Sequence, residues 1–200
     1  MPAGLAPARQ VIGCLGTVLS GWFRLDWLAS FLSIAATRDD GAVFQLTTQD
    51  DPARIRAALD PEARLGDRLR IAPSAHGDVQ KVLQGQTASV MFFTDGLSKL
   101  GSSPTRMAEI LGCGLPVVAN EGVGDVARII SEYRVGVLAK GPEPEAMAAA
   151  WSELTALLKD PDLPSRCRKA AEEVFSLESG TAAYARLYQQ VLEAERGCAA

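Results

Sequence analysis

The stretch that decides the fold runs from residue 89 to residue 119 and reads SVMFFTDGLSKLGSSPTRMAEILGCGLPVVA. Its two ends, Ser89–Phe93 and Pro116–Ala119, are short runs rich in aliphatic and β-branched residues, which are typical of buried strands. Between them, apolar residues recur at helical spacing at Met107, Ile110 and Leu111. The stretch therefore predicts a strand, a loop, a helix and a second strand.

The same alternation continues on both sides of this stretch. Four more runs predict buried strands: Val11–Leu15, Ala42–Thr47, Arg68–Ala72 and Val135–Leu138. Three of the helical patterns follow an aspartate that can cap a helix: Asp51, Asp78 and Asp125. In the helix of the deciding stretch, we expect Ser103 as the cap and Pro104 as the first helical residue.

After the sixth strand the pattern is helical only. Apolar side chains keep helical spacing from Met147 to Leu158, from Cys167 to Val174 and from Ala183 to Leu192. The alternation predicts an α/β fold, a Rossmann-like doubly wound parallel sheet of about six strands in the order 3-2-1-4-5-6, with extra C-terminal helices. We expect residues 1–200 to form a single domain with a frayed tail at residues 197–200.

Composition and charge exclude several functional classes. A chain of 200 residues that is 48% hydrophobic can bury a full core, and its net charge of −4 argues against a nucleic-acid partner. His76 is the only histidine, and no two cysteines form a C-x-x-C pair, so we expect no metal site. The cysteines, which we interpret as reduced thiols of a cytoplasmic protein, are Cys14, Cys113, Cys167 and Cys198.

The N-terminal part leaves two interpretations open. The uncharged run from Gln10 to Phe23 follows Arg9, and it fits either a buried first strand with turn glycines or a targeting segment. It is shorter than the roughly 18 residues that a membrane span requires. Trp22 and Phe23 are either a patch for a membrane or a partner, or a shield over the first helix.

Two loops are the candidates for a ligand site. In a doubly wound sheet, ligands bind at the carboxyl ends where the strand order reverses, which here selects Gly16–Gly21 and Thr94–Thr105. The helix start after the second loop offers N–H groups and a partial positive charge that suit a phosphate. Side chains there add hydroxyl donors and cations: Lys99, Ser102, Ser103, Thr105 and Arg106. The alternative is an ordinary capped helix with surface charges.

The first loop and two further residues add to this site. Gly16, next to Thr17, allows the backbone to approach a ligand closely, although the loop is not a G-x-G-x-x-G fingerprint and the chain has no P-loop. Glu109 can accept two hydrogen bonds from a sugar diol, or it belongs to a solvated helix surface. His76 is a base, a contact to a base edge, or a simple loop residue.

The segment from Ser102 to Asp125 resembles the nucleotide-sugar half of retaining glycosyltransferases of the GT-B fold, glycosyltransferase group 1. Their hallmark is a small-residue loop, a helix reading like E-x-L-A-x-G-x-P-V-V and a glycine-bearing turn, here Glu109–Val118 and Gly122-Val-Gly124. By this resemblance, Glu109 matches the second glutamate of the family's E-x7-E pair, which holds the ribose hydroxyls. The first glutamate is replaced by Gly101.

The first loop also departs from the family pattern. Relatives often carry an arginine and a lysine there to clamp the diphosphate, whereas this chain has Thr17 and Ser20-Gly21-Trp22. Lys99 and Arg106 are the candidates that replace the missing charge. The resemblance thus implies a donor site made of Gly16, Thr17, Lys99, Ser102, Ser103, Thr105, Arg106 and Glu109.

The resemblance implies retaining transfer from a nucleotide-diphosphate sugar, with no metal and no other cofactor. The expected partners are the nucleotide sugar and an N-terminal acceptor-binding domain or partner chain. We also expect peripheral membrane association and self-association through the apolar stripe of the last helix. Two alternatives stay open: a non-catalytic module that binds a nucleotide sugar or sugar phosphate, and a nucleotide-sugar epimerase of similar fold. In either case we expect the isolated chain to transfer no sugar.

Overall fold

The computed structural model describes residues 9–198, with side chains up to residue 193. Six parallel strands form one sheet: β1 (Val11–Leu15), β2 (Val43–Thr47), β3 (Leu69–Ala72), β4 (Ala88–Met91), β5 (Val117–Asn120) and β6 (Gly136–Ala139). Their order is β3-β2-β1-β4-β5-β6, which confirms the predicted topology. The strand order reverses between β1 and β4, so the carboxyl ends of these two strands mark the switch point.

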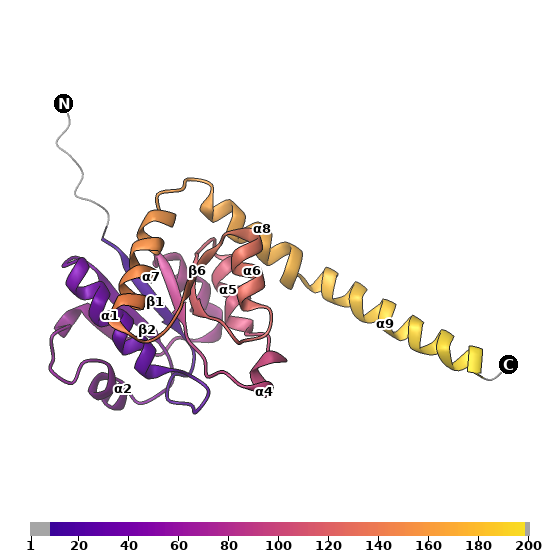
Figure 1. The fold of residues 1–200 in the computed structure, drawn as a ribbon, viewed down its shortest axis with the longest axis horizontal. Coiled ribbons are helices and arrows are strands. Elements are labelled where there is room, and N and C mark those ends of the chain that lie inside the picture. The colour runs from indigo at the N-terminus through magenta and orange to yellow at the C-terminus, as the bar shows by residue number, and fades with distance from the viewer. Residues whose placement is uncertain (1–8, 199–200) are drawn as a thin grey trace.

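Helices cover both faces of this sheet (Figure 1). The core on one face includes side chains of α1 (Leu25–Arg38), α2 (Pro52–Leu59) and α7 (Pro144–Leu157). The core on the other face includes side chains of α3 (Val79–Gln84), α5 (Thr105–Gly112), α6 (Val126–Tyr133) and α8 (Leu163–Phe175). Two short 3-10 turns, Gly66–Arg68 and His76–Asp78, flank β3.

The central strands are buried on both faces because helices pack against each side. Val90 and Val118 belong to the core beneath α1, α2 and α7. Their neighbours Met91 and Ala119 belong to the opposite core, as the two-residue period of a strand requires. Apolar side chains on both faces are the pattern that identified these runs as parallel strands.

Of the three helices with an expected aspartate cap, α2 is capped by its aspartate and the other two are not. The Asp51 side chain caps α2 by accepting the Ala53 N–H at 2.8 Å, as predicted. Asp78 and Asp125 stand directly before α3 and α6 without capping them, because each carboxylate pairs with a cation three residues onward, at 2.8 Å and 3.3 Å respectively.

The expected cap at Ser103 is wrong. Helix α5 begins at Thr105, and Pro104 occupies the capping position with an extended ψ of 107°. Because the backbone of Pro104 is itself extended, the helix begins one residue later than expected and Ser103 lies in the loop. The loop also contains a short helix that the sequence pattern did not reveal, α4 (Leu97–Leu100).

The last helix, α9 (Leu177–Cys198), extends away from the body of the molecule (Figure 1). It includes Gly197 and Cys198, which we expected in the frayed tail, while residues 199 and 200 lie outside the described part. In the described part of the chain, no helix combines the length and the apolar character needed to cross a membrane.

Candidate functional site

The turn after β1 is fixed by hydrogen bonds from two other segments. Gly16 has a φ of +88°, which favours glycine, and its N–H donates to the Thr47 carbonyl at 2.8 Å. One carboxylate oxygen of Asp50, Oδ2, accepts the N–H groups of Val18 at 2.7 Å and Leu19 at 2.9 Å. The backbone donors at Val18 and Leu19 are therefore already bonded within the protein.

The chain then runs beside the end of β4. The Arg24 N–H donates to the Phe92 carbonyl, and the Thr94 N–H donates to the Trp22 carbonyl, each at 3.0 Å. Phe23 is buried by this arrangement and meets the Phe93 ring edge-on at a centroid distance of 5.8 Å. The segment after the first loop is thus held against the loop that follows β4.

A cavity of about 250 Å³ lies at the start of α5. It is lined by Phe93, Lys99, Ser102, Ser103, Pro104, Thr105, Arg106 and Val123. Five of the eight predicted donor-binding residues therefore surround one cavity at the switch point: Lys99, Ser102, Ser103, Thr105 and Arg106. Phe93, which forms part of its wall, was not a candidate from the sequence.

Arg106 reaches back across the switch point to the first loop. A Cβ atom built on Gly16 would lie 2.9 Å from Arg106 Nη2, so the guanidinium packs directly on the glycine. The same guanidinium lies 5.1 Å from the centroid of the Phe93 ring. The long side chain thereby joins the two loops that the strand order nominated.

The Arg106 guanidinium has no ionic partner among the residues that the structure describes. Its Nη1 atom is buried without a hydrogen-bond partner, and burial lowers the pKa of the side chain below its usual value. Burial also raises the pKa of the nearby Cys14 thiol to about 12, so the thiol stays neutral and offers no counter-charge. An unpaired, partly desolvated cation therefore borders the cavity.

Lys99 supplies the second cation of this cavity. Its ammonium lies 4.2 Å from the centroid of the Trp22 ring and 6.0 Å from that of Phe93. Trp22 is 55% exposed, in contrast to its buried neighbour Phe23, so the two aromatic residues have different roles. Trp22 positions the Lys99 ammonium through a cation–π contact.

Glu109 lines a second cavity, of about 300 Å³, next to α5. Its side chain is exposed, and the cavity is also bordered by His76 from the 3-10 turn after β3 and by Val79 and Gln80 of α3. The structure thus brings together Glu109 and His76, which the sequence suggested separately. Thr17, by contrast, is exposed and lines neither of the two cavities.

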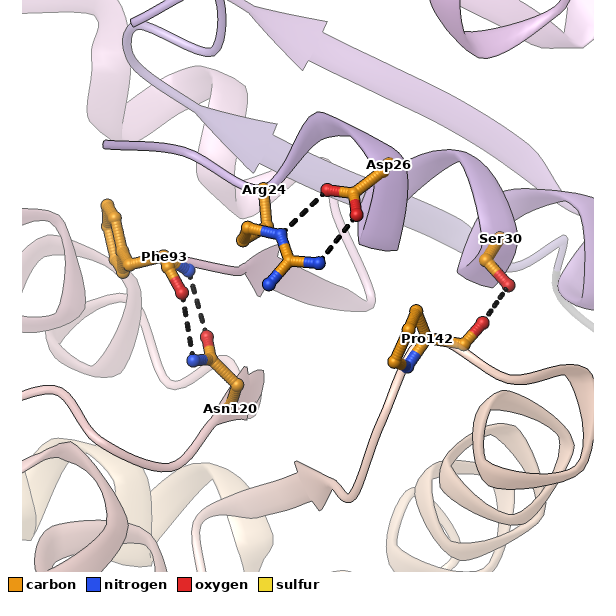
Figure 2. A network of polar contacts seen from close by, with 6 residues as sticks. All are labelled: Arg24, Asp26, Ser30, Phe93, Asn120 and Pro142. Carbon is orange, nitrogen blue, oxygen red and sulfur yellow. Dashed lines mark hydrogen bonds and ion pairs between the residues drawn. The ribbon is translucent and has the colours of Figure 1, made fainter. Parts of the chain in front are cut away.

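The ends of β4 and β5 are tied together by Asn120 (Figure 2). Its side chain accepts the Phe93 N–H at 2.8 Å and donates to the Phe93 carbonyl at 2.9 Å. Figure 2 also shows the two-bond ion pair of Arg24 and Asp26 at the start of α1. Because Phe93 borders the cavity at α5, Asn120 positions one wall of the candidate site.

Other hollows fit the candidate chemistry less well. A cavity of about 410 Å³ lies between α1, α2 and the loop that follows α2, and none of the predicted donor residues lines it. Within residues 9–198, no group of three histidine, cysteine, aspartate or glutamate side chains is arranged to hold a metal ion.

Comparison with solved structures identifies similar folds. The GtfA/B complex matches 92% of this chain at 19% identity with a TM-score of 0.68. Sucrose-phosphate synthase from Thermosynechococcus elongatus matches 95% at 21% identity with a TM-score of 0.67, and TarM matches 90% at 19% identity with a TM-score of 0.69. These alignments cover only 37%, 47% and 35% of the respective structures.

At such identities these matches bear on the fold, and they show that this chain spans less than half the length of those three structures. No curated protein sequence matches the chain. The model of one family, the glycosyl transferases group 1, matches residues 59–174, which include α5, β5 and the cavity at the start of α5. That match covers more than half of the sequence, and the chain belongs to the glycosyl transferases group 1 family.

Proposed function

We propose that this chain is the donor-binding half of a retaining glycosyltransferase and holds a nucleotide-diphosphate sugar at the carboxyl edge of its sheet. The observation that carries the proposal is Arg106, a partly buried cation with an unpartnered Nη1 atom that borders the cavity at α5. Burying an unpaired charge is costly, and a bound anion offsets that cost. Family membership supports glycosyl transfer as the general reaction.

The diphosphate fits the cavity at the start of α5. The first N–H groups of a helix lack partners within it and carry a partial positive charge, which favours an anion. Lys99 and Arg106 add two full charges from different sides of the same cavity. Ser103 and Thr105 add hydroxyl donors to its rim.

The nucleoside fits the cavity that Glu109 and His76 share. Glu109 lies four residues after Thr105, which places it about 6 Å further along the helix axis from the phosphate end. Its carboxylate can accept both hydroxyls of a ribose, while the imidazole of His76 lies within reach of a base edge. Both cavities border α5, and in this proposal one extended ligand spans them.

The chemistry that these residues supply is positioning and electrostatic stabilisation. The leaving nucleoside diphosphate gains negative charge in the transition state, and preorganised N–H groups with Lys99 and Arg106 stabilise that charge. Glu109 positions the donor without touching the reacting bond. A non-catalytic binding module is the second candidate, since Gly101 carries no carboxylate and Asp50 already occupies the first-loop amides.

The first test replaces Arg106 by methionine, which keeps packing volume on Gly16 and removes the charge. By calorimetry against UDP, GDP and ADP, we expect at least tenfold weaker binding of the nucleotide that binds the parent. Stability to urea should hold or rise, because a desolvated unpaired cation is lost. Lys99→Ala should weaken binding more at low salt than at high salt.

The matched control is Lys169→Ala, which removes an exposed lysine of α8 far along the chain from the site. It should leave the affinity unchanged at every salt concentration. Equal affinity of the Arg106→Met variant and the parent, or no binding of any of the three diphosphates by the parent, would rule out the proposed donor site.

A further inference from the structure

An anion of the protein itself lies against the first loop: Asp50, in the segment between β2 and α2. Asp50 Oδ2 accepts two consecutive backbone N–H groups, those of Val18 and Leu19, and Val18 is only 1% exposed. The Asp50 N–H in turn donates to Thr48 Oγ1 at 3.1 Å, which restrains the residue that carries the carboxylate. The negative charge is therefore fixed beneath the loop rather than free in solvent.

Consecutive N–H groups of this kind form a concave site that binds anions in many proteins. Here the protein's own carboxylate occupies it, so a substrate phosphate cannot use these two donors. The phosphate must therefore be held by other donors, and Arg106, which packs on Gly16 of the same loop, is the candidate. Asp50 binds this loop at Val18 and Leu19, two and three residues beyond the glycine that Arg106 contacts.

The charge of Asp50 also acts on the guanidinium. Burial lowers the pKa of Arg106, and the nearby carboxylates Glu109 and Asp50 act in the opposite direction by favouring the charged form. Asp50 therefore acts on the charge of Arg106, and it weakens the net positive field that an incoming anion meets. The weakening grows with the negative charge of the ligand.

We propose that Asp50 is a specificity-determining residue that disfavours the nucleoside diphosphate product relative to the nucleotide-sugar donor; this rests on the proposed function. Near neutral pH the free diphosphate carries about one more negative charge than the sugar nucleotide, because its terminal phosphate ionises a second time near pH 6. A fixed negative charge near the site therefore repels the product more strongly than the donor, which favours release of the product relative to release of the donor.

The test compares three variants by calorimetry with UDP and UDP-glucose, and with GDP and GDP-mannose. Asp50→Asn removes the charge and keeps an oxygen that can accept both N–H groups, whereas Asp50→Ala removes both. Asp51→Asn is the matched control, because it makes the same charge change one residue away, at the cap of α2. Hydrogen exchange of the Val18 and Leu19 amides is measured in the same ligand-free proteins.

We expect Asp50→Asn to tighten diphosphate binding about threefold or more and sugar-nucleotide binding by a smaller factor. Asp51→Asn should change both affinities less than twofold. The two amides should stay protected in Asp50→Asn and lose protection in Asp50→Ala. An equal change for both ligands, weaker diphosphate binding in Asp50→Asn, or the same result in Asp51→Asn would overturn the specificity role.

The exchange measurement separates this inference from the function on which it rests. If the parent binds none of the four nucleotides, both the donor site and the specificity role fall, even where the amides are protected. If the parent binds and Asp50→Asn shows no preference between the ligands, the donor site stands and only the role of Asp50 falls.

Discussion

At the scale of single residues, the candidate site depends on Arg106, and the free-energy cost of burying its unpaired charge is only partly compensated within the protein. Arg106 loses much of its hydration, yet the rings of Phe93 and Phe23 lie 5.1 and 5.9 Å from its guanidinium and give partial compensation. Gly16 makes the approach feasible, since its positive φ and missing Cβ both suit the contact. The remaining deficit is what a bound diphosphate would offset.

Glu109 is the residue at which the role in binding can be separated from any role in folding. Its side chain is exposed on α5, so Glu109→Gln should leave thermal stability nearly unchanged. If it holds a ribose diol, the variant should lose about 1–3 kcal/mol of nucleotide affinity, the usual size of a charged hydrogen bond. Calorimetry together with thermal unfolding measures both quantities.

Two comparisons sharpen this test. Glu172→Gln makes the same change on the exposed side of α8 and should alter neither affinity nor stability. His76→Ala should weaken the binding of nucleoside diphosphates and leave the binding of inorganic pyrophosphate unchanged. Of the two cavities next to α5, His76 borders only the one that Glu109 also lines. A stability loss in Glu109→Gln with unchanged affinity would make Glu109 a structural residue.

At the scale of elements, the ends of β4 and β5 carry the walls of the site. The side chain of Asn120, the last residue of β5, accepts the N–H of Phe93 and donates to its carbonyl (Figure 2). Asn120 is 6% exposed, so water cannot readily replace these bonds. The loop after β4 therefore starts from a defined position.

Asn120→Ala leaves two backbone groups of Phe93 without their partner. We expect it to destabilise the fold by about 1–3 kcal/mol in urea unfolding, the cost of leaving buried polar groups unpaired. Ser30→Ala is the comparison, since Ser30 contributes a single bond to the Pro142 carbonyl at 2.7 Å (Figure 2). A loss no larger than that of Ser30→Ala would show that the Phe93 pairing contributes little.

At the scale of the whole molecule, the last helix presents apolar side chains that nothing in the described residues covers. Its large apolar side chains are half or more exposed: Leu177, Tyr184, Leu187, Tyr188, Val191 and Leu192. A contiguous apolar face of this kind normally packs against a partner. The chain also spans less than half the length of the three similar structures named above, so a second half is the partner we propose.

The isolated chain should accordingly bind the donor and transfer no sugar to an external acceptor. One half leaves the donor open to water, whereas the reaction needs a closed cleft. The assay incubates the chain with labelled UDP-glucose or GDP-mannose and candidate acceptors, with and without a separately expressed acceptor-binding half. Robust transfer by the chain alone would show that these residues build the acceptor site as well.

The exposed face of α9 should also promote self-association of the isolated chain. Sedimentation at increasing concentration measures this, and Leu187→Glu should reduce the association without changing donor affinity. If sugar transfer appears only when the second half is added, and self-association is weaker in that mixture, the same face of α9 docks both partners.

The sequence by itself determined the fold class and the order of the strands. Local patterns were sufficient because the two-residue and 3.6-residue periods report burial directly, and connections between parallel strands follow one handedness. Asp51 as the cap of α2 was likewise predictable, since its partner is two residues away. The start of α5 was not, because Pro104, the expected first helical residue, has an extended backbone and takes the capping position, so the helix begins at Thr105.

The site itself was decided by the tertiary structure. The sequence assigned Gly16 and Arg106 to one expected donor site, but only the tertiary structure shows that the Arg106 guanidinium packs on the backbone of a glycine ninety residues away. The same holds for Glu109 with His76 and for Asp50 beneath the first loop. Each of these pairs comes from segments far apart in the sequence, and no periodicity within one segment records which side chain of another segment will meet it.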